Sequence, residues 1–312
     1  MKKLGIPLKE PWLGFMKNTP SLWVLSLNII KFKMDFLDAV KARKFLDRLT
    51  FLIKIKQPFA AKIEEIKFSN FNATRITPED AKEEKVILYL HGGAYIAGGG
   101  DYCRSVGTNV AKYSGWQTLV VDYRLAPENP YPAALEDALT AYTTLLEQGI
   151  EPSNIVLFGD SAGGGLCFAL CHKLKDCKIA LPKAIIALSP WTDLSLSGES
   201  HTTNLKKDPI LSIFNGNPVF HYVQDDSVEN PYISPIFGDF SGFPSIFIIV
   251  GENEILLSDS LILGEKAYTQ GVNVQIQVWK GMFHVFPIIS KIPESRKAMH
   301  EILVFINNLI YQ

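Results

Sequence analysis

Residues 155–165 read IVLFGDSAGGG, an apolar run followed at once by glycines that surround Ser161. The run is short and partly β-branched, which predicts a buried strand, and residues 162–175 after it are predicted to form a helix. The pattern G-x-S-x-G therefore falls at a strand-to-helix junction, where a sharp turn exposes the serine hydroxyl. Small residues on both sides of that turn let the strand and the helix pack closely. This stretch predicts a parallel α/β sheet with a nucleophilic serine at the end of one strand.

The alternation of strand and helix patterns runs along most of the chain. Strands are predicted at residues 86–90, 118–123, 155–158, 184–189, 246–250 and 274–279, after an extended or hairpin segment at 66–77. Helices are predicted at residues 103–113, 133–148, 162–175, 258–270 and 294–310. Such alternation favours a mostly parallel central sheet with helices on both faces, and we assign residues 61–312 to this domain.

Two segments do not follow the alternation. Residues 1–60 are rich in Phe, Leu, Ile and Trp and are predicted to be helical, while residues 195–235 form a polar, proline-containing insertion between two strands. We expect both to contribute to a cap over the sheet edge that bears Ser161; the alternative is that both are ordinary surface segments. The apolar run SLWVLSLNII at 21–30 is too short to span a bilayer and lacks a small-residue cleavage site. No membrane insertion and a cytoplasmic location are therefore expected, with peripheral membrane contact left open.

The composition excludes other classes of protein. The chain has 312 residues, 47% of them hydrophobic and 20% charged, which is typical of a soluble globular protein. A net charge of −1 provides no basic footprint, so no nucleic-acid partner is expected. The four cysteines form no C-x-x-C pair, and Cys167 and Cys171 would share one face of a helix. Buried free thiols are expected, ahead of a disulfide, redox pair or metal site.

A serine hydroxyl is a weak nucleophile, so it needs a base and a group that orients the base. In open parallel sheets, such groups follow the carboxyl ends of the strands. His284 follows the last predicted strand and is the favoured base. The remaining histidines have weaker claims, because none combines this position with this chain order: His91, His172, His201, His221 and His300.

Several carboxylates could orient His284. Glu252, Glu254 and Asp259 follow the strand at 246–250, and Asp193 follows the preceding strand. We favour Glu254, with the other three as alternatives.

The stretch HGGAY at 91–95 follows the strand at 86–90 and has two interpretations. One is simply a tight turn, since glycine permits backbone angles that other residues resist. The other is that the amide N–H groups of Gly92 and Gly93 point at a ligand. The stretch alone favours neither.

Six motifs, in order and at compatible spacing, resemble the hormone-sensitive-lipase-like family of α/β-hydrolases, which also holds the bacterial family IV esterases. They are HGGAY (91–95), DYRLAPE (122–128), YPAALEDA (131–138), GDSAGG (159–164), SPWTDL (189–194) and GMFHVF (281–286). The resemblance runs from about residue 85 to residue 290. It implies an α/β-hydrolase fold with a helical cap.

The resemblance also implies a role for each candidate residue. Ser161 is implied as the nucleophile and His284 as the base. Residues 251–257 are similar to the G-x-x-E-x-L-L stretch of some members, which implies Glu254 as the orienting acid. Many relatives carry Asp at the acid position, and the extra methylene of Glu254 changes its reach.

An oxyanion hole is the second implied element. The resemblance assigns it to the backbone amides of Gly92, Gly93 and Ala162. Ala94 stands where many relatives have a further glycine, a variation that leaves these donors intact. His91 is expected to brace this loop by hydrogen bonding and not to act as the base.

These residues predict a serine-dependent carboxylic ester hydrolase for small-molecule esters with short to medium acyl chains. No cofactor and no metal are expected, and a homodimer is compatible with the sequence. An amidase or deacetylase with the same triad is the nearest alternative. A non-catalytic ligand-binding protein, as in plant gibberellin receptors that resemble the same family, is disfavoured because those lack the catalytic histidine. A haloalkane-type hydrolase is excluded, because it would need an acidic nucleophile at position 161, where this chain has serine.

Overall fold

The computed structural model describes residues 59–82, 84–211 and 217–310, together with strand β1 (Leu13–Met16) and six single positions between 39 and 53. Most of the predicted N-terminal cap, including the apolar run at 21–30, lies outside the described residues. The same holds for residues 212–216 of the predicted second cap segment.

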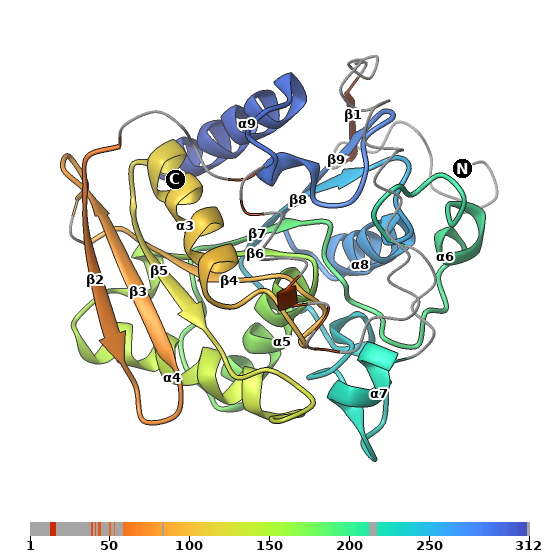
Figure 1. Ribbon diagram of the computed structural model, residues 1–312, viewed down its shortest axis with the longest axis horizontal. Helices are drawn as coiled ribbons and strands as arrows, with labels where there is room; N and C mark the ends of the chain where they lie inside the picture. The colour runs from red at the N-terminus through yellow and green to blue at the C-terminus, as the bar shows by residue number, and fades with distance from the viewer. Residues whose placement is uncertain are drawn as a thin grey trace.

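The described strands form one sheet, in the order β1-β9-β8-β7-β6-β4-β5-β3-β2. Their bounds are β2 Ala61–Lys67, β3 Asn72–Pro78, β4 Val86–Leu90, β5 Gln117–Asp122, β6 Ile155–Asp160, β7 Ala184–Leu188, β8 Ser245–Gly251 and β9 Val274–Trp279. Only the β2–β3 and β3–β5 pairs are antiparallel among the described strands. The predicted α/β fold with a mostly parallel sheet is therefore confirmed (Figure 1).

Helices cover both faces of the sheet (Figure 1). They are α3 Asp101–Ser114, α4 Ala133–Glu147, α5 Ala162–Asp176, α6 Ser200–Thr203, α7 Asn217–Val223, α8 Leu257–Thr269 and α9 Pro293–Ile310, with 3-10 turns η3 Pro152–Asn154, η4 Pro235–Phe237 and η5 Phe286–Ile288. One buried core contains the inner residues of α4, α5 and α8, and the other contains those of α3 and α9. Alternate residues of β4 enter opposite cores, with Leu88 in the first and Tyr89 in the second. This alternation is why the strand is apolar throughout its length.

One part of the N-terminal prediction is wrong. Residues 1–60 were expected to be helical, yet residues 13–16 form β1, which pairs in parallel with β9. Without β1, the outer edge of β9 would present unpaired backbone N–H and C=O groups. Pairing with another strand satisfies those groups, and a segment of four residues is too short for a local pattern to favour a helix over this pairing.

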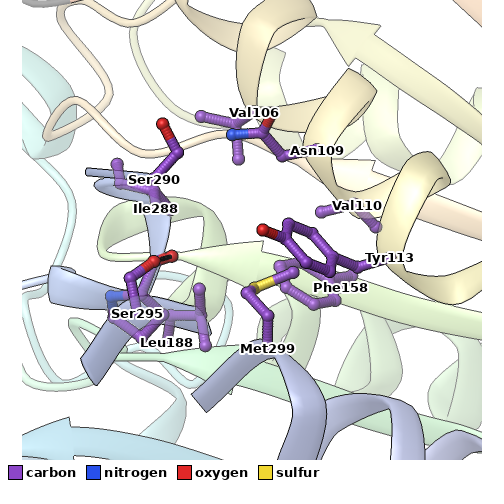
Figure 2. A pocket seen from close by; sticks show the side chains of 11 residues that line it. Val106, Asn109, Val110, Tyr113, Phe158, Leu188, Ile288, Ser290, Ser295 and Met299 are labelled. Atoms are coloured by element: carbon purple, nitrogen blue, oxygen red, sulfur yellow. Dashed lines mark hydrogen bonds between the residues drawn. The ribbon is translucent and has the colours of Figure 1, made fainter. Parts of the chain in front are cut away.

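A small internal cavity lies between α3, α9 and η5, on the α3/α9 side of the sheet (Figure 2). Its volume is about 10 Å³, so it has room for one water molecule and not for a substrate. It is lined in part by Asn109, whose buried Oδ1 has no hydrogen-bond partner, and a single water would supply one.

All four cysteines are free thiols. Cys103, Cys167 and Cys171 are buried, as expected, whereas Cys177, which follows α5, is exposed. Burial raises the pKa of the Cys167 and Cys171 thiols, which keeps both in the unreactive neutral form. Among the residues that the structure describes, no helix combines the length and the apolar character needed to cross a membrane.

His172 of α5 has a packing role. Its buried ring lies against Phe240 and Phe243, and its Nε2–H donates to the Pro235 carbonyl over 3.1 Å. Burial lowers the pKa of His172 from 6.5 to about 4. The folded protein therefore holds this histidine neutral at pH values where an unfolded chain protonates it.

We expect His172→Gln to make the fold less sensitive to acid. Between about pH 6.5 and pH 4 the unfolded state binds one proton more than the folded state at this position, so the free energy of unfolding falls as the pH falls. The slope from this residue is at most about 1.4 kcal/mol per pH unit. Glutamine keeps an N–H donor for Pro235 but does not titrate. Denaturant unfolding of both proteins across this window should show their stabilities converging toward acid, and parallel pH dependences would contradict the assignment.

Candidate active site

Ser161 sits on a strained turn between β6 and α5. Its backbone angles are φ 54° and ψ −121°, a region that residues with a Cβ rarely occupy. The turn is tied on both sides, because its amide donates to Leu188 O over 2.8 Å and its carbonyl accepts from the amide of Trp191 over 2.9 Å. A Cβ at Gly163 would lie 2.1 Å from Leu90 O, so glycine is required for α5 to begin this close to β4.

A chain of hydrogen bonds leads away from the Ser161 hydroxyl. His284 Nε2 lies 3.0 Å from Ser161 Oγ, and His284 Nδ1 lies 2.9 Å from Glu254 Oε2. A carboxylate accepts, so the ring carries its proton on Nδ1 and turns the lone pair of Nε2 toward the serine. Side chains of both His284 and Glu254 are nearly inaccessible to solvent, at 4% and 0% exposed. The structure therefore brings the three predicted residues together in the geometry of a nucleophile, a base and an orienting acid.

The second carboxylate oxygen of Glu254 also accepts hydrogen bonds. Glu254 Oε1 accepts from the Ser189 hydroxyl over 2.8 Å and from the amide of Gly251 over 2.5 Å. The Ser189 hydroxyl in turn accepts from the amide of Val285, the residue after His284, over 3.0 Å. Ser189 could not be assigned a role from the sequence, because a single serine at the start of SPWTDL carries no pattern of its own.

The three rival carboxylates have other partners. Asp259 Oδ2 accepts from the amides of Thr192 and Asp193, and its Oδ1 pairs with His201 Nε2 over 2.8 Å. Asp193 accepts from residues 195 and 197, and Glu252 accepts from the amide of Gly281. Glu254 is therefore the carboxylate that contacts the base, as favoured from the sequence.

The predicted oxyanion hole needs a correction at Gly92. Its amide donates to Asp160 Oδ1 over 3.0 Å, so that N–H is not available to a ligand. The expectation that Gly92 is a donor is wrong, because the direction of an amide depends on backbone angles that the motif does not specify. Among the described residues, the amides of Gly93 and Ala94 have no hydrogen-bond acceptor.

Ala162 provides a third amide near the same place. It is the first residue of α5, where backbone N–H groups have no partner within the helix. The side chain of Ala162 is buried, and its amide follows Ser161 directly. Gly93, Ala94 and Ala162 are thus candidates for the backbone donors to a substrate oxygen, and Ala94 was not among the residues predicted from the sequence.

The carboxylate that holds Gly92 belongs to a buried network. Asp160 accepts from the hydroxyls of Tyr89 over 2.6 Å and Tyr102 over 2.8 Å. Burial raises the pKa of both tyrosines well above the usual value, so they stay neutral donors. Asp160 is fully buried, and three donors compensate its removal from water. Because it is the variable position of G-x-S-x-G, its role could not be read from the motif.

His91 braces the same loop, as expected. Its Nδ1–H donates to Gly92 O over 2.8 Å, and its ring stacks on Tyr123 with centroids 4.0 Å apart. The Tyr123 hydroxyl donates to His91 O over 2.6 Å. Burial lowers the pKa of His91, so the ring is neutral. Its contacts are with the loop backbone and not with Ser161.

The segment 195–235 packs against two parts of this site. Tyr222 of α7 stacks on Tyr95 of the loop that follows Ala94, with centroids 3.8 Å apart. Asn204 Nδ2 donates to the carbonyls of Glu252 and Glu254, each over 3.0 Å. The insertion is therefore fastened to the loop of free amides and to the loop of the acid. Within the described part of the chain, no group of three or more His, Cys, Asp or Glu side chains is placed to hold a metal ion.

Comparison with known proteins shows the family to which this chain belongs. A family model described as the alpha/beta hydrolase fold matches residues 87–288, more than half of the chain. The chain therefore belongs to the alpha/beta hydrolase family.

Individual relatives narrow this class. An esterase of Acinetobacter venetianus is 36% identical over 270 residues, covering 86% of this chain and 88% of the relative. An acetyl-hydrolase of Streptomyces hygroscopicus is 37% identical over 223 residues, covering 70% and 74%. The crystal structure of an esterase from the bacterial hormone-sensitive lipase family superposes with a TM-score of 0.86 at 32% identity, covering 94% of this chain and 100% of that one. Within the hydrolases, the chain is a member of the hormone-sensitive-lipase-like group of bacterial esterases.

Proposed function

We propose that this protein is a carboxylesterase that uses Ser161 as its nucleophile. The observation that carries the proposal is the continuous hydrogen-bonded chain from Ser161 Oγ through His284 to Glu254, beside amides that have no partner. Membership of a family whose similar members are named esterases and acetyl-hydrolases supports it.

The reaction proceeds in two halves. Ser161 Oγ attacks the ester carbonyl carbon while His284 Nε2 takes the hydroxyl proton. The tetrahedral intermediate then collapses, the bond to the alkoxy oxygen breaks, and His284 gives its proton to the leaving alcohol. Water next attacks the acyl-enzyme with His284 again accepting a proton, and collapse releases the acid and restores the serine. Glu254 keeps the imidazole oriented and stabilises its charged form in each half.

Gly93, Ala94 and Ala162 are proposed as the donors to the oxyanion. All three follow a strand at the sheet edge that bears Ser161, and their N–H groups have no competing acceptor among the described residues. A donor of this kind typically contributes about 3–4 kcal/mol of transition-state stabilisation. Gly92 supports them indirectly, because its bond to Asp160 fixes the loop.

The proposed substrates are small esters with short to medium acyl chains. Residues 195–235 and the part of residues 1–60 that lies outside β1 are proposed to form the cap that bounds the acyl pocket. Two contacts support this cap. Tyr222 stacks on Tyr95, and Arg43 Nε donates to Ile96 O over 2.8 Å, so both join the proposed cap to the loop that follows β4. A cytoplasmic location and a homodimeric state stay predictions. An amidase or deacetylase activity with the same residues is the alternative.

We expect Ser161→Ala to abolish ester hydrolysis without unfolding the protein. Alanine removes only the hydroxyl, so the turn loses no packing. A fluorophosphonate probe should label the wild-type protein at Ser161 and leave the variant unlabelled. A panel of p-nitrophenyl esters and matched anilides measured on the wild type separates the two activities, and faster turnover of the anilides would favour the amidase. Residual wild-type-like hydrolysis in the variant would exclude the serine mechanism.

We expect Glu254→Ala to lower kcat by a factor on the order of 10³ or more, because an orienting acid contributes somewhat less than the base it holds. Asp259→Asn is the matched control. Asp259 binds backbone amides and His201, so its substitution should lower the free energy of unfolding and leave kcat per folded molecule nearly unchanged. Steady-state kinetics with active-site titration measures both. An inactive Asp259→Asn beside an active Glu254→Ala would reverse the assignment.

We expect kcat/KM to rise with acyl length and then fall. The resemblance to the hormone-sensitive-lipase-like family implies a maximum between about four and eight carbons. Each methylene that is buried contributes about 0.8 kcal/mol until the pocket ends. The profile is measured with p-nitrophenyl esters of graded length below their solubility limits. Strong activation at the surface of emulsified long-chain triglycerides would argue against a bounded pocket.

A further inference from the structure

We infer that Ser189 is a positioning residue for the proposed triad, acting by locking the Glu254 carboxylate to the loop that carries His284. The inference rests on the proposed function. It assigns to the first residue after β7 a role that neither the catalytic triad nor the oxyanion hole includes.

The direction of the Ser189 hydrogen bonds is fixed by their partners. The amide of Val285 can only donate, so the Ser189 oxygen must accept from it over 3.0 Å. The hydroxyl proton is then directed at Glu254 Oε1, which lies 2.8 Å away. One hydroxyl thus connects the acid to the residue beside the base, and neither bond can reverse.

The carboxylate needs this contact to hold one orientation. Glu254 is fully buried, and its Oε2 is used by His284 Nδ1. The other oxygen, Oε1, receives only the Gly251 amide and the Ser189 hydroxyl among the described residues. Without the hydroxyl the carboxylate keeps one donor on Oε1, while the buried Val285 amide loses its acceptor. Both losses act on the geometry of His284.

The backbone at Ser189 is strained, which indicates that the position of its side chain is maintained at a conformational cost. Its φ is 48°, the left-handed region that a residue with a Cβ avoids. Its amide donates to Ile249 O of β8 over 2.8 Å, and its side chain is fully buried. A glycine would adopt this turn with less strain, so packing and backbone conformation alone do not require serine here.

The test compares Ser189→Ala and Ser189→Gly with the wild type on one p-nitrophenyl ester. Both variants lack the hydroxyl, and the glycine variant also relieves the backbone. We expect kcat to fall about ten- to hundredfold in both, since a hydrogen bond to a charged group is lost, with KM changed by less than about twofold. Ser260→Ala is the matched control. Ser260 is equally buried, its hydroxyl donates to Leu256 O and to no other group among the described residues, and its substitution should leave kcat unchanged.

A double-mutant cycle shows whether Ser189 acts through Glu254. In the Glu254→Ala background, Ser189→Ala should lower kcat by less than about threefold, because the group it positions is gone. Equal fold-losses in both backgrounds, or wild-type kcat in Ser189→Gly, would overturn the inference. If Ser161→Ala keeps its turnover, the proposed function fails instead. If Ser161→Ala is inactive while the Ser189 variants keep their kcat, only the role of Ser189 is lost.

Discussion

The close approach of α5 to the ends of β4 and β6 is the constraint on which the rest of the site depends. With no Cβ at Gly163, the first turn of α5 lies against Leu90 O, and the chain between β6 and α5 must turn within one residue. That residue is Ser161, held at φ 54° and at a conformational cost of about 1–3 kcal/mol. Backbone hydrogen bonds to Leu188, the last residue of β7, and to Trp191 in the loop after β7 stabilise it. The strained conformation is what exposes the hydroxyl to His284 and places the amide of Ala162 beside it.

Parallel pairing then determines which residues can meet this hydroxyl. In the strand order β9-β8-β7-β6-β4, every neighbouring pair is parallel, so all five strands end at one edge. Each contributes one part: the loop of free amides after β4, Ser161 after β6, Ser189 after β7, Glu254 after β8 and His284 after β9. Ser189 lies between the nucleophile and the acid in this order, which is why one short side chain reaches both the carboxylate and the base-bearing loop.

Features that depend on residues close together in the sequence could be predicted, whereas features that depend on distant residues could not. The strands from β4 to β9 and their helices were predicted because each is an uninterrupted apolar or amphipathic run. Ser161 and His284 were predicted because each lies shortly after a strand, and Glu254 was chosen among the carboxylates after β8 because residues 251–257 are similar to the G-x-x-E-x-L-L stretch of some family members. β1 was missed, since four residues carry no clear period and the pairing with β9 is remote in sequence. Gly92 was misassigned and Ala94 missed for another reason: the direction of an amide depends on local dihedral angles and on Asp160, which lies 68 residues away.

The buried carboxylates of Asp160 and Glu254 orient different parts of the site. Asp160 accepts hydrogen bonds from two tyrosine hydroxyls and from the Gly92 amide, so it fixes the backbone of the loop that follows β4. With Gly92 turned toward Asp160, the chain continues through positive φ values at Gly93 and Ala94, and their amides have no acceptor in the described part of the chain. Glu254 orients a side chain: Ser189 and the Gly251 amide donate to its carboxylate and fix it, and the carboxylate in turn orients the His284 ring. A buried charge that is fully hydrogen-bonded is rigid, whereas one with a missing donor is costly and mobile. The two carboxylates, one bound to the Gly92 amide and the other to His284, therefore hold the loop at 92–94 and the imidazole ring in place.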